Sequence, residues 1–509
     1  MTETANGVAE VEQPVSSTQL SAWTTESSVP REETSLSDGW EMVIGLEVHA
    51  ELATETKMFS PARNHFGSAP NSNVHPVCLG LPGTLPVVNG KAVELSIRLG
   101  LALNCTVQRC VFARKNYFYP DMPKDYQISQ YDRPLNISGW LELPNGHRIG
   151  IERAHMEEDT GKSTHIGDSG RIHDAGYSLV DYNRAGVPLI EIVSHPDVRG
   201  PEEAKAYVAE LQTILIAIGA SDGKFEEGSL RVDANISVRP SGSDELRTRC
   251  EVKNVNSLRS LGRAILYEAQ RHVDLYESGE APRQETRHWD EEGGRTRPGR
   301  SKEQAEDYRY FADPDLVPVD PDPAWVEEIR AALPVLPRER RIALIDRGVA
   351  AGQAAIAVEK HLDALAIAAI ETGADPAKTV NHVINNLSVD DGAESLDPAG
   401  FAALVSMEVA GELTATQAKA VLAEMVSAGR DPVVIAAEMG FEAMDTTELE
   451  GLIDGLIADN PGEWERFVTG DDRERGKMQG FFTGQIMKAT KGQADGKIVN
   501  QILAARRSA

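Results

Sequence analysis

The sequence predicts an α+β fold, in which a largely antiparallel sheet is followed by a helical region. Between Gly39 and Pro321, short runs of alternating apolar and polar residues are broken by glycine, proline and Asn-Gly turns such as Asn89-Gly90 and Asn145-Gly146. After Pro334 the composition shifts to alanine, leucine, isoleucine, valine and glutamate at helical spacing. This segregation of strands and helices favours α+β over a regular strand-helix alternation.

The chain has 509 residues, which is too long for a single hydrophobic core, so several modules are expected. Residues 1–38 are rich in serine, threonine, glutamate and glycine and have little to bury, which predicts a disordered lead-in. We expect a sheet domain over residues 39–333, a helical domain over residues 334–435 and a small helical unit over residues 436–509.

Two helices are expected to interrupt the strands, and capping residues mark further helices later in the chain. Pro201 suits the first turn of a helix whose apolar residues recur at helical spacing as far as Ile218. A second helix is expected to begin near Ser260. In the later region, Asp397-Pro398 is typical of a helix start, and Thr414 to Gln417 fits a capping box.

Charge and cysteine content narrow the class of protein. Lysine and arginine total 51 against 79 aspartate and glutamate, a net charge of -28, which disfavours nonspecific attraction to nucleic acid or to an anionic membrane. The 4 cysteines are too few and too scattered for a disulfide framework, so we expect reduced thiols and a cytoplasmic protein. No signal-peptide pattern or membrane-spanning segment is recognised in the sequence.

Two strongly alternating segments present ligating groups on one face of a strand. In Met42–Leu52, Glu47 and His49 share the face opposite the apolar residues, and Asp233 does the same in Leu230–Val238. Glu251 recurs in a third such segment. Carboxylates and imidazoles on a stiff sheet are suited to divalent cations and phosphates, which predicts metal-dependent phosphate chemistry. The plainer alternative is a solvated face whose acids are neutralised by basic neighbours.

Three further segments carry cations beside aromatic rings or acids. Arg114–Gln127 interleaves cations with aromatic residues and contains two prolines, so we expect a rigid loop that stacks a base, or one that its rings pin to the core. His155–Ser163 places three acids before Gly161-Lys162; it lacks the first Walker glycine, and we favour Glu158 over Glu157 as the inward ligand. Arg295–Lys302 is expected to be a glycine- and proline-containing loop carrying four cations.

The C-terminal end departs from the acidic trend of the chain. Residues 471–509 hold eight lysines and arginines against four acids. A basic end on an acidic protein is typical of RNA contact, and an ordinary solvated helix surface is an equal alternative.

Several long motifs, in order along the chain, resemble the B subunit of the heterotrimeric aspartyl/glutamyl-tRNA amidotransferase GatCAB. The resemblance extends from about Met42 to the C-terminus, where it matches the YqeY-like tail of the GatB family. The matching runs are Val43–His49, Cys78–Gly83, Arg114–Gln127, Glu157–Asp159, Asp181–Gly186, Gly228–Pro240, Asp307–Phe311 and Gly480–Gln493.

The resemblance implies a fold, a reaction and partners. It implies a cradle domain, a helical domain and a tRNA-binding tail. Members of the family phosphorylate the side-chain carboxylate of Glu-tRNA(Gln) or Asp-tRNA(Asn) with ATP and Mg²⁺, and ammonia comes from an amidase A subunit, with a small C subunit alongside. The implied catalytic residues and metal ligands are Glu47, His49, Glu158, Asp233 and Glu251. The implied nucleotide contacts are Lys115, Tyr117, Lys162, Arg231 and Lys253.

Two departures and two competing functions stay open. His75 stands where many relatives have a cysteine, so His75, Cys78, Cys105 and Cys110 form an incomplete zinc set, and structural zinc is disfavoured. A short extra hairpin is expected between Thr164 and Tyr177. The competing functions are a noncatalytic tRNA-binding scaffold of the same complex and a free-standing metal phosphohydrolase.

Overall fold

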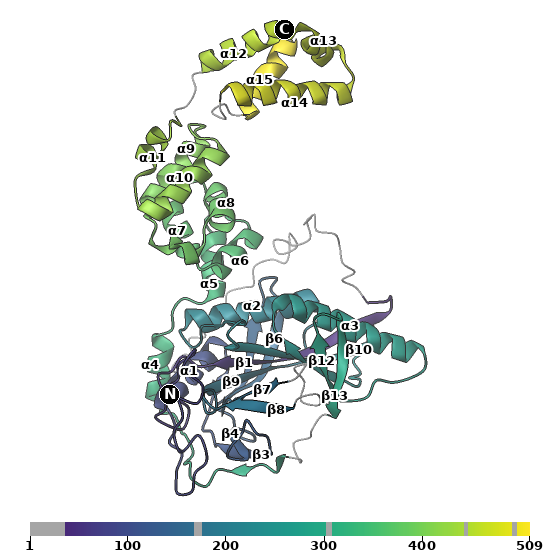
Figure 1. Ribbon diagram of the computed structural model, residues 1–509, viewed down its shortest axis with the longest axis vertical. Coiled ribbons are helices and arrows are strands. Elements are labelled where there is room, and N and C mark those ends of the chain that lie inside the picture. The colour runs from purple at the N-terminus through teal and green to yellow at the C-terminus, as the bar shows by residue number, and fades with distance from the viewer. Residues whose placement is uncertain (1–35, 167–175, 302–307, 442–445, 491–495, 509) are drawn as a thin grey trace, which may run out of the picture. The chain divides into compact units, whose positions relative to one another are not determined.

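The computed structural model describes residues 36–166, 176–301, 308–441, 446–490 and 496–508 (Figure 1). The expected lead-in falls outside these residues except for its last three. The chain divides into two compact units, Met1–Arg338 and Glu339–Ala509. The first unit contains the sheets and the second is helical, which confirms the α+β prediction. Among the described residues, no helix is long and apolar enough to cross a membrane.

A mixed sheet of 9 strands forms the centre of the first unit, in the order β13-β12-β11-β10-β1-β9-β6-β5-β2. All neighbours pair antiparallel except β11 and β12, which are parallel. The strands are β1 (Trp40–Glu51), β2 (Thr106–Val107), β5 (Asn136–Glu142), β6 (Arg148–Glu158), β9 (Pro188–Ser194), β10 (Leu230–Pro240), β11 (Cys250–Val255), β12 (Glu285–Asp290) and β13 (Arg295–Ser301).

Helices cover one face of this sheet, and two small sheets lie toward the other (Figure 1). The helices are α1 (Gly90–Ala102), α2 (Pro201–Ala217), α3 (Leu258–Glu277) and α4 (Pro323–Ala331). The small sheets are β14-β3-β4, from Phe311–Ala312, Ala113–Asn116 and Tyr126–Ser129, and β7-β8, from Lys162–Ile166 and Tyr177–Asp181. The hairpin expected between Thr164 and Tyr177 corresponds to β7 and β8, with its tip outside the described residues.

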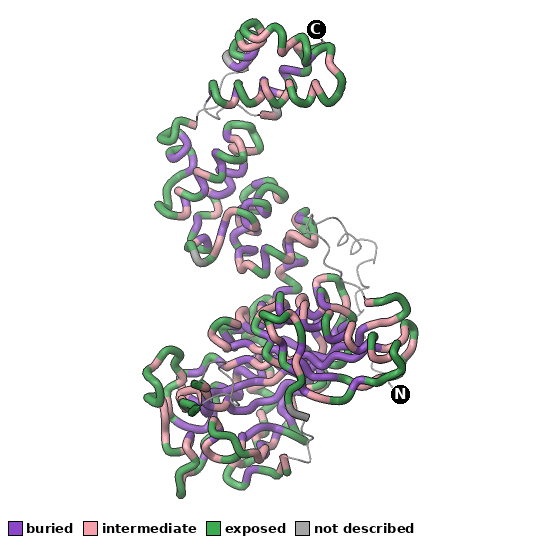
Figure 2. The backbone as a smooth tube through the Cα atoms, turned by 45° about the vertical axis from the view of Figure 1, so that its right-hand side comes forward, coloured by how far each residue is buried: buried purple, intermediate pink, exposed green. Residues whose placement is uncertain are grey.

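The alternation in β1 and β10 is confirmed. Ile44, Leu46 and Val48 of β1 and Val232 and Ala234 of β10 are no more than 2% exposed and pack in the core under the helices. The central strands are buried along much of their length, whereas loops and outer helix faces are exposed (Figure 2). The side chains between the buried ones therefore project from the opposite face, where they are free to form a site.

Two elements differ from the sequence-based expectation. Asn89-Gly90 is not a hairpin turn: Asn89 is the N-cap of α1, and its side-chain oxygen accepts the backbone N–H groups of Lys91 and Ala92. Asn-Gly suits either structure, because asparagine caps helices as readily as it enters turns. Arg295–Ser301 is the edge strand β13 rather than a loop, since Pro298 and Gly299 are tolerated at a sheet edge.

The second unit consists of helices around two separate apolar clusters. One spans Leu344 to Ala436, and the other spans Leu449 to Leu503. Thr414 and Gln417 form the predicted capping box, and Asp397 caps the helix that starts at Pro398. The helices are α5 (Pro337–Ile345), α6 (Ala351–Glu359), α7 (Asp363–Glu371), α8 (Pro376–Asn386), α9 (Pro398–Val409), α10 (Ala415–Ala428), α11 (Pro432–Glu438), α12 (Thr446–Asp459), α13 (Pro461–Thr469), α14 (Asp472–Ala489) and α15 (Gly496–Ser508).

The Asn89 cap gives a first testable prediction. Its amide nitrogen also donates to the carbonyl oxygens of Thr56 and Lys57, so Asn89→Ala removes bonds on both sides of the cap. We expect a loss of about 1 to 2 kcal/mol in the free energy of unfolding, measured by urea titration with tryptophan fluorescence. Asn145→Ala is the matched control, because the exposed Asn145 accepts one backbone N–H, and a larger loss there would contradict the assignment.

Candidate active site

A first group of acids lies on the open face of the sheet, where β1, β10 and β11 run side by side. Glu47 stands opposite Asp233, and each of Glu47, Asp233 and Glu251 offers a carboxylate oxygen within 4.8 Å of the others. Hydrogen bonds orient two of them. Asn235 Nδ2 donates to Glu47 at 2.8 Å, and Thr286 Oγ1 donates to Glu251 at 2.8 Å. Strand register therefore brings these three predicted ligands together.

The Lys253 ammonium balances these carboxylates. Its Nζ lies 2.5 Å from Asp233 Oδ2 and 3.2 Å from Glu251 Oε1. Burial alone would lower the pKa of Lys253, but attraction to Asp233 and Glu251 outweighs it and raises the pKa well above its usual value. Oxygens held this close attract cations, and within the structure Lys253 is one such cation.

A second group lies next to the first, on β1, β6 and β9. His49 Nε2 is 3.8 Å from Glu157 and 3.7 Å from Glu191, and His155 Nε2 is 3.3 Å from Glu191. Burial alone would raise the pKa of Glu191, but His155, His49 and Lys115 hold it well below its usual range. Like the first group, His49, Glu157 and Glu191 each offer a ligand atom within 4.8 Å of the others.

Glu158, the acid that the sequence analysis favours over Glu157, does not join either group. Its carboxylate forms an ion pair with Lys124 and accepts the backbone N–H of Ile128 at 2.9 Å. Neighbouring residues on a strand point to opposite faces, so β6 can present only one of the two acids to the open face. The structure brings Glu157 to His49 and directs Glu158 to the β4 side.

A hollow of about 220 Å³ connects the two groups. Arg231 lines it and forms an ion pair with Asp159 at 2.8 Å. Near this pair, burial and the negative charge of Asp159 raise the pKa of Glu51 to about 7. The lining residues are His49, Gln127, Glu157, Asp159, Leu189, Arg231, Asp233 and Lys253.

Three further residues are predicted to contact the nucleotide. Lys115 and Tyr117 lie at the border of the site, and Lys162 lies outside it. Lys115 lies 4.7 Å from the ring centroid of Tyr308 and is close enough to Glu191 to influence its charge. The Tyr117 ring lies 6.2 Å from the same Tyr308 ring, and its pKa is raised by burial and by the negative charge of Glu157. Lys162 is exposed on β7 and does not line the hollow.

Comparison of the chain with known protein families finds two matching family models. A family model described as the GatB/GatE catalytic domain matches residues 42–327, and one described as the GatB domain matches residues 368–506. The chain belongs to the GatB family. This confirms the resemblance inferred from the motifs.

Curated members of the GatB family match along almost the whole chain. A protein of Corynebacterium efficiens is 48% identical over 484 residues, which cover 91% of this chain and 96% of the relative. One of Salinispora arenicola is 48% identical over 490 residues, covering 92% and 96%, and one of Carboxydothermus hydrogenoformans is 47% identical over 478 residues, covering 91% and 98%. Each is named as the B subunit of an aspartyl/glutamyl-tRNA(Asn/Gln) amidotransferase.

In this GatB chain, Glu191 and His155 are the site residues that sequence reasoning missed. Glu191 is a lone acid in Pro188–Ser194, an otherwise buried apolar strand. A single charge in such a strand is a signal, because an unpaired carboxylate is costly to bury. His155 pairs with it across the β6–β9 register.

The residues of the incomplete zinc set are not assembled as a metal site among the described residues. Cys78 Sγ lies 3.2 Å from Ser60 Oγ, and the groups of metal-ligating side chains in the described part of the chain include none of the four residues. Burial raises the pKa of Cys105 to about 12 and that of Cys110 to about 11, so both are neutral thiols. They act as small core residues.

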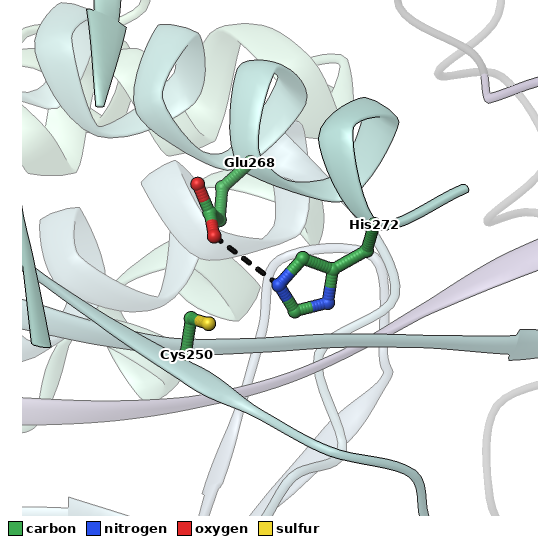
Figure 3. A group of neighbouring side chains, drawn as sticks. All are labelled: Cys250, Glu268 and His272. Carbon is green, nitrogen blue, oxygen red and sulfur yellow. Dashed lines mark hydrogen bonds and ion pairs between the residues drawn. The ribbon is translucent and has the colours of Figure 1, made fainter. Parts of the chain in front are cut away.

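A third group, Cys250, Glu268 and His272, is buried between the sheet and α3 (Figure 3). It does not fit a metal ion. Glu268 is already bonded to His272 at 3.1 Å and to Arg271 at 2.5 Å, and burial raises the pKa of Cys250 to about 11. Arg287 adds a further ion pair to Glu268 at 3.3 Å. This network ties α3 to the sheet.

We expect Glu268→Gln to lower the free energy of unfolding by about 3 kcal/mol at pH 7, because it removes the charge that the half-buried Arg271 and the buried Arg287 share. Burial alone would raise the pKa of Glu268, but His272 and Arg271 depress it, so its contribution is present above the unfolded pKa near 4.3 and is lost as the pH falls below that value. The difference in melting temperature between wild type and variant should therefore shrink toward pH 3.

Glu327→Gln is the control for this prediction, because Glu327 pairs with Arg330 on the surface of α4, where such a pair contributes about 0 to 1 kcal/mol. Equal melting temperatures of the two variants at pH 7 would contradict the role of Glu268.

Proposed function

We propose that this chain uses ATP and Mg²⁺ to phosphorylate the side-chain carboxylate of Glu-tRNA(Gln) or Asp-tRNA(Asn), as the B subunit of an amidotransferase. Ammonia then replaces the phosphate and gives Gln-tRNA(Gln) or Asn-tRNA(Asn). One observation carries the proposal: two groups of metal-ligating side chains lie beside one hollow on the open face of the sheet, and both acidic and basic side chains line it. The names of the relatives, which are amidotransferase subunits for aspartyl- and glutamyl-tRNA, support the substrate class.

The chemistry explains why ATP is needed. A carboxylate does not react with ammonia at neutral pH, because oxide is a very poor leaving group. A carboxylate oxygen therefore attacks the γ-phosphorus, and the bond from that phosphorus to the ADP oxygen breaks. Ammonia then attacks the carbonyl carbon of the acyl phosphate, and inorganic phosphate leaves with the electron pair of the broken C–O bond.

The side chains present fit divalent cations. Glu47, Asp233 and Glu251 supply the hard oxygen ligands that Mg²⁺ prefers, and His49 with Glu157 and Glu191 forms a second possible set. Bound there, Mg²⁺ would offset the repulsion between the phosphates and the carboxylate substrate. The proposal takes Glu157 rather than Glu158 as a metal ligand, because Glu157 lies beside His49 and Glu158 pairs with Lys124.

The basic side chains at the hollow have a different role from the metal ligands, which is to bind phosphate. Arg231 and Lys253 line it and are placed to hold phosphate oxygens, and Lys115 and Tyr117 border it on the nucleotide side. Lys162 lies outside the hollow, so the proposal assigns it no contact. A cation held by Asp233 and Glu251 would compete with the Lys253 ammonium for their oxygens, so Lys253 would be released toward the phosphates.

Membership of the GatB family supports the rest of the proposed assembly. An amidase A subunit supplies the ammonia, a small C subunit completes a cytoplasmic heterotrimer, and the sheet domain, the helical domain and the tail divide the work of catalysis and tRNA binding. The basic end supports tRNA contact at the tail, although Arg506 there is paired with Glu450 and Asp454. A noncatalytic tRNA-binding scaffold is the competing proposal.

The test of function uses the heterotrimer with His49→Ala. We expect ATP cleavage that depends on Glu-tRNA or Asp-tRNA to fall on the order of a hundredfold, the usual cost of losing one electrostatic contact to a transition state, with tRNA affinity retained. His147→Ala is the matched control, since His147 pairs with Glu203 outside the hollow, and it should keep full activity. Unchanged cleavage in His49→Ala would favour the scaffold.

Direct cation binding tests the choice between the two adjacent acids. We expect Glu157→Gln to weaken Mn²⁺ binding at least about tenfold, measured by electron paramagnetic resonance, because it removes a charged ligand. Glu158→Gln should leave Mn²⁺ affinity near that of wild type, since Glu158 faces Lys124. The reverse order of the two variants would restore Glu158 as the ligand.

A further inference from the structure

Five tyrosine rings form a continuous row beside the His49, Glu157 and Glu191 group. Going along the row, the ring centroids of Tyr119 and Tyr117 are 5.9 Å apart, those of Tyr117 and Tyr308 are 6.2 Å apart, and those of Tyr308 and Tyr310 are 6.1 Å apart. Tyr310 and Tyr131 are stacked, with centroids 4.3 Å apart and planes 8° apart. The rings come from two stretches that are distant in sequence, residues 117–131 and 308–310, so the fold assembles the row.

The row is open to solvent at both ends. Tyr131 is 51% exposed and Tyr119 is 42% exposed, and neighbouring Phe118 is 74% exposed. Rings that only stabilise a core are buried, so packing alone does not account for these. Aromatic rings that are exposed on a protein surface are suited to stacking on nucleobases.

The middle of the row borders the proposed active site. Gln127 lines the hollow and pairs with Lys115 across β3 and β4, two residues before Tyr117. Burial raises the pKa of Tyr310, and the negative charges of Glu157 and Glu191 add to this effect. Lys115, whose ammonium lies 4.7 Å from the Tyr308 centroid, also acts on Glu191. A ligand stacked on the row would therefore have its end at the acids.

The segment that supplies Tyr308 and Tyr310 is held in an unusual backbone conformation. Arg309 has φ of 47°, in the left-handed region that disfavours residues with a side chain. Asn116 Nδ2 fixes the turn by donating to the carbonyl oxygens of Tyr308 at 3.1 Å and Arg309 at 2.9 Å. The Arg309 side chain is exposed and forms no ion pair with any residue that the structure describes.

We propose that the tyrosine row, made of Tyr119, Tyr117, Tyr308, Tyr310 and Tyr131, stacks the unpaired nucleobases at the 3′ end of the RNA substrate, with Arg309 at its phosphodiesters. The proposal rests on the proposed function, which makes tRNA the substrate. The contacts within the row are edge-to-face except for the stacked pair Tyr310 and Tyr131, so bases meet the exposed rings at its two ends. A single adenine covers one or two rings, whereas exposed rings at both ends, Tyr119 and Tyr131, can each receive a base of the same strand. In a chain of net charge -28, backbone phosphates need a local cation, and the exposed Arg309 supplies one.

The first test measures binding of the heterotrimer to tRNA and to the same tRNA without its single-stranded 3′ nucleotides, by fluorescence anisotropy. We expect Tyr131→Ala to weaken binding of the intact tRNA about tenfold, the usual size of one stacking contact. Tyr131→Phe is the matched control and should bind like wild type, because stacking needs the ring and not the hydroxyl. All three proteins should bind the shortened tRNA equally.

Several outcomes would overturn the proposal. These are no loss in Tyr131→Ala, an equal loss for the shortened tRNA, or an equal loss in Tyr131→Phe. A raised KM for ATP in Tyr131→Ala without any loss of tRNA affinity would assign the row to the adenine of ATP instead. Failure of the proposed function is separate: the wild-type complex would then cleave no ATP, whatever its affinity for the two tRNAs.

A second test addresses Arg309 through salt dependence. Arg309→Gln should reduce the slope of log affinity against log salt concentration by about 1, the value for one lost phosphate contact. Arg330→Gln is the control, because Arg330 lies on α4, which packs against α1 on the helix-covered face. An unchanged slope in Arg309→Gln would remove Arg309 from the RNA contact.

Discussion

Repulsion between carboxylates on one face of the central sheet is the constraint on which the site depends. Two carboxylates about 5 Å apart repel by roughly 3 kcal/mol at an effective dielectric of about 20. Glu47, Asp233 and Glu251 lie closer together than that. Their proximity is sustained by cations, which in this structure are side chains such as Lys253. A metal cation can therefore take the place of the lysine on this face, and metal-dependent chemistry on phosphates requires such a site.

The carboxylates can be held this close together because helices cover the other face of the sheet. Burial of the apolar side chains of β1 and β10 under α2 and α3 fixes the strand register, and a slip of one residue would send the acids into the core. The register that places Glu47 opposite Asp233 is thus set by residues that never touch the ligand. Stability and chemistry are encoded on alternate residues of the same strands.

Sequence reasoning predicts the parts of the site that lie on strongly alternating strands. Glu47, His49 and Asp233 are recognisable because each stands between apolar neighbours, and the α+β fold follows from the same pattern. The choice of Glu158 over Glu157 shows where alternation is too weak to use: Ala154 and Met156 are buried and put Glu157 on the open face, but the three successive acids after them continue no pattern. Glu191 is missed because pairing across β6 and β9 is a long-range contact that one strand does not reveal. Helix α1 is missed because Asn-Gly is equally suited to a turn and to a cap.

Two consecutive residues of strand β11 face opposite sides of the sheet. Cys250 points to the back, where its sulfur lies 3.4 Å from Arg271, and the next residue, Glu251, points to the front. Any change that loosens the interior behind the sheet will shift the carboxylate in front of it. Variants at the back will therefore mimic the loss of a ligand in activity assays, although the groups they remove never meet the substrate.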